Sequence, residues 1–67
     1  MKVLDEFEIT DRMKLRLQVG DYRDEERIDI RQYIKVDKEF IPTKKGINFS
    51  VEWLDKFFLM VEKLKDI

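Results

Sequence analysis

The chain has 67 residues, among them no cysteine and no histidine. This composition excludes disulfides and the thiolate and imidazole ligands of structural zinc sites. A domain this small buries only about 60% of the surface that its unfolded chain exposes, so a second subunit is the remaining way to enlarge its core. No segment has the roughly 18 uncharged apolar residues of a membrane span, and the acidic start of the chain is unlike a signal peptide. We expect one soluble intracellular domain over residues 1–67, cytoplasmic or nucleoid-associated, or nuclear in a eukaryote.

The net charge of −1 conceals an uneven distribution of charged residues. Between Arg12 and Phe49, ten Lys/Arg residues stand against seven Asp/Glu residues, a balance of +3. The two flanking segments hold four against eight, a balance of −4. The basic residues are therefore concentrated in the middle of the chain, where patterns of alternation predict strands.

Residues 12–19 alternate strictly between polar and apolar side chains, which is typical of a half-buried strand. On its polar side, Arg12, Lys14 and Arg16 place three cations at a period of two, so they project from one face of a sheet. A short strand around Phe7 and Ile9 is expected before it. The acidic run at 24–26 predicts a hairpin turn, and a second charged strand follows over residues 27–34.

Residues 40–42 predict a short edge strand that ends at a proline, and residues 43–46 predict a basic loop before alternation resumes over 47–49. Ser50 occupies the position of an N-cap, so a helix is expected from residue 51 to about 65. Its apolar residues form two adjacent stripes. One stripe is expected to pack on the sheet. The other is expected to join two subunits helix to helix through Trp53, Phe57, Met60 and Leu64. Strands over about 7–49 followed by one helix define an α+β domain.

Catalysis is disfavoured because the chain lacks the commonest general base and the most reactive nucleophile. Its single serine, Ser50, is best explained as the helix cap. Adjacent acids in a predicted turn are typical of a solvated loop, and two glycines cannot build a phosphate-binding glycine loop. We therefore expect a protein that is not an enzyme and has no cofactor and no metal site.

The predicted strand faces opposite the apolar side combine cations with Tyr22 and Tyr33. Proteins bind single-stranded nucleic acid in this way, with a positive groove along the phosphates and bases stacked on aromatic rings. On residues alone a second interpretation stays open: arginines on sheets also pair with neighbouring acids such as Asp29, and Tyr33 also fits a core position with its hydroxyl at the rim.

Two segments, Ile28–Tyr33 (IDIRQY) and Lys44–Phe49 (KKGINF), followed by a helix that contains Trp53, resemble the positive cofactor four family of transcriptional coactivators. The resemblance covers roughly residues 7–64. It implies a curved four-stranded antiparallel sheet with one C-terminal helix, whirly-like in type, that dimerises through the helices and binds single-stranded DNA across paired sheets. The family's regulatory serine-rich tail has no counterpart here, so the chain resembles a compact version.

By the same resemblance, Arg31 corresponds to a phosphate-contacting arginine and Lys45 to a loop lysine, while Tyr22 with Arg23 matches an aromatic-basic pair. Three departures imply weaker DNA binding: Ile34 replaces a stacking tryptophan, Ile41 replaces a basic residue, and the hairpin at 24–26 is acidic. The predicted nucleic-acid-binding set is Arg12, Lys14, Arg16, Tyr22, Arg23, Arg31, Tyr33, Lys44 and Lys45.

The function expected from the sequence is sequence-tolerant binding of single-stranded DNA by a homodimer, as an accessory to transcription, replication or repair. Transcription or replication proteins are further partners that the sequence leaves open. Two alternatives also stay open. The wide apolar helix face allows a protein–protein interaction module, and a stacking sheet serves RNA as well as DNA.

Overall fold

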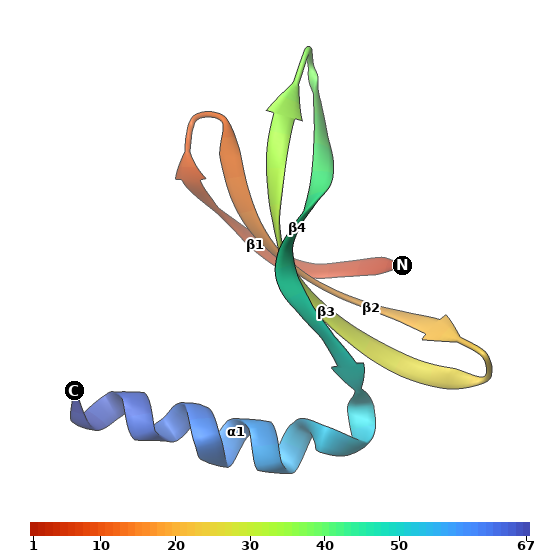
Figure 1. Ribbon diagram of the computed structural model, residues 1–67, viewed down its shortest axis with the longest axis vertical. Coiled ribbons are helices and arrows are strands. Elements are labelled where there is room, and N and C mark those ends of the chain that lie inside the picture. The colour runs from red at the N-terminus through yellow and green to blue at the C-terminus, as the bar shows by residue number, and fades with distance from the viewer.

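The computed structural model describes all 67 residues, as four strands followed by a helical segment. The strands form one antiparallel sheet in chain order (Figure 1). Their bounds are β1 Lys2–Thr10, β2 Met13–Tyr22, β3 Glu25–Val36 and β4 Glu39–Ser50. A 3-10 turn, Val51–Trp53, leads into α1, Leu54–Glu62, and a second 3-10 turn, Lys63–Asp66, ends the chain. The predicted α+β fold, with an antiparallel four-stranded sheet and one C-terminal helix, is confirmed.

The strands are longer, and the connections shorter, than the sequence predicts. Two-residue turns at 11–12, 23–24 and 37–38 join the strands. The acids at 25 and 26 therefore belong to β3 and not to the hairpin turn. Arg12 was expected within a strand, but it lies in the β1–β2 turn, where its carbonyl accepts a hydrogen bond from the Lys35 amide at 2.8 Å. Ladder pairing extended to the strand ends because two-residue turns satisfy more backbone groups than longer loops do.

The segment Thr43–Gly46, predicted to be a loop, is part of β4. Pairing with β3 runs on both sides of it, with Tyr33 opposite Pro42 and Arg31 opposite Gly46. The three residues 43–45 thus lie opposite the single residue Gln32, which makes this part of β4 a bulge. A bulge absorbs extra residues without ending a strand, so the proline and the basic run did not terminate pairing as expected.

The sheet has an apolar face and a polar face, because strand residues alternate between the two sides. Cross-strand register aligns Leu17 with Ile30 and Val19 with Ile28 on the apolar side, and Leu15 of β2 lies on the same side opposite Gln32 of β3. On the opposite side, Lys14, Arg16 and Gln18 share a face with three residues of β3. The alternation read over residues 12–19 therefore places these side chains as predicted, apart from Arg12.

Little of the chain is buried: only six of 67 residues fall in the buried class. The apolar ones are Ile28, Tyr33 and Phe49. Phe7, on the apolar face of β1, is 62% exposed. A single chain of this size does not cover the apolar side of its own sheet.

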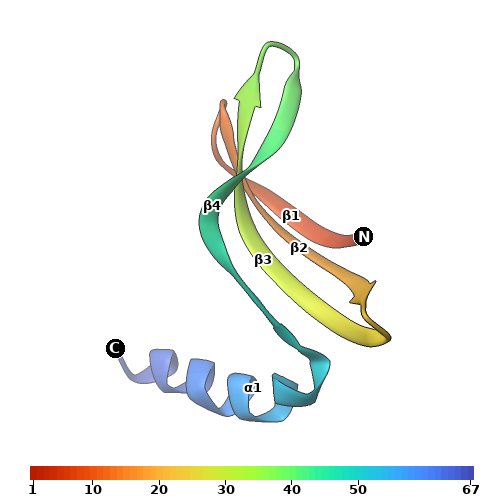
Figure 2. The ribbon, with the colours of Figure 1, turned by 45° about the vertical axis from the view of Figure 1, so that its right-hand side comes forward.

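Ser50 is a cap as predicted, because its side chain accepts a hydrogen bond from the Glu52 amide at 3.2 Å, but it caps the 3-10 turn, and α1 begins at Leu54, three residues later than expected. Phe49 packs against Trp53 and Phe57, with ring centroids 6.2 and 4.9 Å apart. Beyond this contact the helix runs away from the end of β4 (Figures 1 and 2).

The sheet was expected to cover one of the two apolar stripes of the helix, and this expectation was wrong. Only residues near the start of the helix, such as Leu54 and Phe57, are half-buried, and Phe58, Met60 and Leu64 are exposed. The twisted sheet touches one end of the helix and not its length. None of the helices combines the length and apolar character that crossing a lipid bilayer requires.

The β2–β3 turn stores backbone strain, because both of its residues, Arg23 and Asp24, have positive φ (53° and 62°) and neither is glycine. We predict that Asp24→Gly stabilises the protein by about 0.5 to 1 kcal/mol, since glycine adopts this conformation without a Cβ clash. Chemical denaturation at one fixed protein concentration measures the change.

Asp11→Gly is the matched control, because Asp11 lies in the β1–β2 turn and its φ is not positive. Glycine there adds only freedom to the unfolded chain and should lower stability or leave it unchanged. Equal effects of the two substitutions would contradict the explanation.

Candidate nucleic-acid interface

The polar face brings two of the predicted cations directly opposite each other. In the β2–β3 register, Arg16 pairs with Arg31, Lys14 with Tyr33, and Gln18 with Asp29. Like charges directly opposite on a sheet are destabilising unless acids lie beside them. The arrangement therefore depends on the carboxylates around the two arginines.

Glu6 of β1 supplies the first of these carboxylates. Its Oε2 accepts from Arg16 Nε at 2.8 Å and its Oε1 accepts from Lys14 Nζ at 3.1 Å. Hydrogen bonds from these two cations hold the pKa of Glu6 below its ordinary value of 4.5, and the one from Lys14 has the larger effect. Two of the predicted phosphate-binding cations are thus already paired with one acid.

Asp29 supplies the second carboxylate, and it is buried, with 4% of its surface exposed. Arg31 donates to it three times, from Nε at 3.2 and 3.3 Å and from Nη2 at 3.1 Å. Gln18 and Asn48 also donate to Asp29, both at 3.4 Å. The remaining nitrogen of Arg31, Nη1, donates to the Thr43 carbonyl at 2.8 Å.

The aromatic residues of the predicted site differ in accessibility. Tyr33 is 7% exposed: the Arg16 guanidinium lies over its ring, 4.1 Å from the centroid, and Gln18 donates to its hydroxyl. In this conformation the ring is covered, in agreement with the core alternative left open for it. Tyr22 is 61% exposed at the end of β2, with Arg23 5.2 Å from its centroid. Of the two rings, only that of Tyr22 is accessible to solvent.

Sequence reasoning missed Phe40 and Lys35 on this face. Lys14 Nζ lies 4.4 Å from the centroid of Phe40, and Lys35 Nζ lies 6.0 Å from it. Phe40 pairs with Lys35 in the β3–β4 register. The even spacing of Phe40 and Pro42 places both on one face of a strand. That spacing assigns Phe40 to the polar face only if β4 is continuous, and the predicted loop at 43–46 interrupted it. Glu6 was missed because pairing across separate strands leaves no mark in local sequence.

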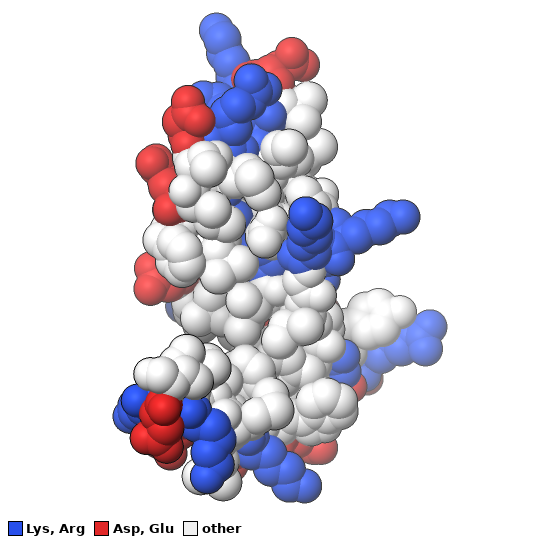
Figure 3. All heavy atoms as spheres, turned by 60° about the vertical axis from the view of Figure 1, so that its left-hand side comes forward, with Lys and Arg blue, Asp and Glu red and all other residues white.

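The predicted residues thus form one cluster and several outlying positions. Lys14, Arg16, Arg31 and Tyr33 lie together in the middle of the polar face, and the bulge with Lys44 and Lys45 adjoins Arg31. Arg12 and Arg23 lie in turns at opposite ends of β2 (Figure 1). In the space-filling view, Lys and Arg side chains project at the top and along one side, while an uncharged surface continues down the middle onto the helix (Figure 3).

An open antiparallel sheet with one polar face, one apolar face and a capping C-terminal helix places the chain in a defined class of small α+β domains. Residues 9–58 match the family described as Transcriptional Coactivator p15 (PC4). The chain therefore belongs to the PC4 family, and the resemblance seen in its sequence is confirmed.

Solved structures agree with this assignment. The chain is similar to BPSL1147, a PC4 homolog from Burkholderia pseudomallei K96243, with a TM-score of 0.85, 22% identity and 96% of each chain covered. It is also similar to a bacteriophage T5 homolog of PC4 implicated in recombination-dependent DNA replication, with a TM-score of 0.75, 25% identity and coverage of 92% of this chain and 70% of that one. MoSub1, solved as a complex with DNA, matches with a TM-score of 0.62, 24% identity and coverage of 92% and 77%. A search among curated proteins found no matching sequence.

Proposed function

We propose that this protein binds single-stranded DNA without strong sequence preference, as a homodimer, in support of transcription, replication or repair. The observation that carries the proposal is the cluster of cations on the polar face, next to a lysine-bearing bulge. Family membership supports it, as do the DNA complex of MoSub1 and the replication role given to the T5 homolog. This is a binding function, in which no side chain needs to perform chemistry.

Phosphate contacts are assigned to five cations whose ends are free or are paired only with an exposed acid. Binding exchanges their solvent or carboxylate contacts for phosphate oxygens and releases counterions from the strand. The exposed ring of Tyr22, beside Arg23, offers a stacking surface worth about 1 to 3 kcal/mol per base, whatever the base. Arg31, a sixth predicted cation, has its guanidinium hydrogen-bonded within the sheet. The five are Arg12, Lys14, Arg16, Lys44 and Lys45.

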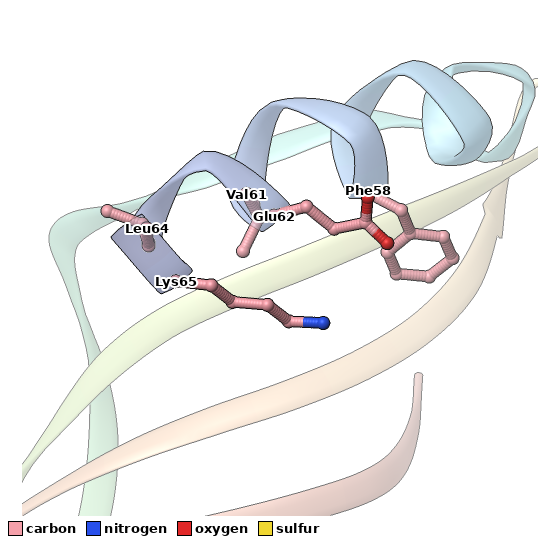
Figure 4. Close-up of a pocket in the computed structure, with 5 residues that line it drawn as sticks. All are labelled: Phe58, Val61, Glu62, Leu64 and Lys65. Carbon is pink, nitrogen blue, oxygen red and sulfur yellow. The ribbon is translucent and has the colours of Figure 1, made fainter. Parts of the chain in front are cut away.

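A second copy of the chain is the proposed cover for the exposed apolar surface. Trp53, Met60 and Leu64 are each about 60% exposed (60, 64 and 58%). On the same helix, Phe58 and Val61 line an open hollow (Figure 4). Contiguous exposed apolar side chains mark interaction surfaces, and an isolated helix of nine residues is marginal without packing. Helix-to-helix dimerisation would bury the exposed apolar residues and stabilise the short helix.

The exposed apolar face also favours one alternative, a protein–protein module whose polar face binds nothing. The two proposals separate on one variant, Lys44→Met with Lys45→Met. Weaker binding of DNA by the variant, with the dimer intact, supports the DNA-binding proposal, and an intact dimer that binds no DNA even without the substitutions supports the alternative. Competition between matched DNA and RNA oligonucleotides decides the preferred polymer.

The salt dependence of binding tests the proposed function directly. If five phosphates are contacted, the logarithm of the affinity for poly-dT should fall with the logarithm of salt concentration with a slope of about −3.5. Filter binding across a salt series measures it. A slope near zero, or no binding at low salt, would refute the proposal.

Glu6 should act as an internal competitor for phosphate, because its carboxylate occupies Lys14 and Arg16. We predict that Glu6→Gln raises the affinity for a dT oligomer several-fold, since Lys14 and Arg16 no longer exchange a carboxylate for phosphate, and leaves the salt slope at about −3.5 because both cations are already among the five. Because the pKa of Glu6 is lowered from 4.5, its carboxylate is charged above that value, and the ion pairs are lost only as the pH falls below it. The gain should therefore be equal at about pH 6 and about pH 8.

Glu8→Gln removes the same charge from the same strand and serves as the control. Glu8 lies opposite Lys14 in the register, but the ion pair of Lys14 is with Glu6. Equal gains from the two variants would show that net charge alone matters and would contradict the competition.

The proposed dimer predicts that Met60→Glu shifts the protein toward monomer, because it places a charge inside the helix contact. Leu59→Glu is the control: Leu59 is equally exposed, at 64%, but shares its side of the helix with Asp55 and Lys63, one turn before and after. Sedimentation analysis over a protein dilution series measures both variants. A wild-type monomer, or dissociation by Leu59→Glu alone, would contradict the proposed interface.

A further inference from the structure

The basic bulge of β4 is a fixed structure and not a loose loop. The Thr43 hydroxyl donates to the Gln32 carbonyl at 2.9 Å and accepts from the Lys45 amide at 3.2 Å. One side chain thus ties the bulge to β3 and closes the turn between residues 43 and 45. Lys44 and Lys45 of the proposed phosphate-binding set both project from this bulge.

The strands approach so closely beside the bulge that only glycine fits at position 46. A Cβ there would lie 2.6 Å from the Ile30 carbonyl oxygen and 2.8 Å from the Arg31 Cα, distances that real Cβ atoms do not show. Backbone contact at Gly46 sets one end of the bulge, and the Thr43 hydrogen bonds set the other. The direction in which Lys44 and Lys45 project is therefore determined by a few contacts.

Arg31 connects this bulge to the buried carboxylate of Asp29. Its Nη1 donates to the Thr43 carbonyl at 2.8 Å, while Nε and Nη2 are occupied by Asp29. Asp29 is itself held by Gln18 and Asn48 from the two neighbouring strands. A guanidinium fixed at both ends has a set orientation and few donors left for a phosphate.

We propose that Arg31 is a positioning residue, which links Asp29 to the Thr43 carbonyl and thereby aims Lys44 and Lys45 at the nucleic-acid backbone. This inference rests on the proposed DNA binding and replaces a direct phosphate contact of Arg31 with an indirect one. Its consequence is that substitutions which disturb the bulge but leave both lysines in place should still weaken the contacts of Lys44 and Lys45 with phosphate.

Thr43→Val tests the inference, because it removes the hydroxyl and preserves shape and charge. We expect the Lys45 amide to exchange faster with solvent and the affinity for a dT oligomer to fall several-fold. The salt slope should become shallower by up to about 1.4, as though two cations were lost. In the background of Lys44→Met with Lys45→Met, Thr43→Val should have no further effect on affinity.

Thr10→Val is the matched control for the exchange measurement, because Thr10 Oγ1 accepts from the Arg12 amide at 3.2 Å in the same local pattern, away from the bulge, and its loss should leave the Lys45 exchange unchanged. Arg31→Lys separates positioning from direct contact, because lysine keeps the charge but not the planar fork. We expect Arg31→Lys to reproduce the faster Lys45 exchange and the shallower slope.

Three outcomes overturn the inference while the proposed function stands: unchanged Lys45 exchange in Thr43→Val, faster exchange with unchanged affinity, or full affinity and slope in Arg31→Lys. A wild-type protein that fails to bind the oligomer overturns the proposed function, and this inference with it. Amide exchange is measured without DNA, so the two failures are distinguishable.

Discussion

Two arginines face each other across the central strands, and the sheet tolerates them because a carboxylate lies beside each. Glu6 of β1 compensates Arg16, and Asp29 of β3 compensates Arg31. The two carboxylates differ in setting, because Glu6 is accessible to solvent whereas Asp29 is buried. An exposed ion pair is weak and is easily exchanged for another anion, while a buried pair is costly to break. The same face therefore contains ion pairs that exchange easily and one that is costly to break.

This division is compatible with the proposed binding of a polyanion by a chain of net charge −1. Most charges of the polar face cancel locally, so the overall balance says little about any one region. The lysines of the bulge, like Lys35 on the same face, pair with no acid among the ion pairs of the structure. The bulge that carries them is held by the hydrogen bonds of Arg31 and Thr43.

The apolar side of the sheet, unlike the polar face with its paired charges, is not satisfied within one chain. Phe49 packs against Trp53 and Phe57 at the start of the helix. Beyond them no other part of the chain covers the apolar residues of the helix. A helix that touches the sheet at one end only leaves most of its remaining apolar residues exposed. The open sheet and the projecting helix thus have one cause, namely that a chain this small cannot bury all of its own apolar surface.

Local pattern was enough to predict the element order, the two faces of β2, the Ser50 cap and the family, because alternation and helix spacing are properties of neighbouring residues. The IDIRQY strand and the KKGINF segment carried the family resemblance for the same reason. Only the tertiary structure decided that Thr43–Gly46 is a bulge within β4, that Glu6 occupies Lys14 and Arg16, and that Tyr33 is covered while Tyr22 is open. Each of these depends on register between strands, which is set by pairing across the sheet and leaves no periodic signal in the sequence.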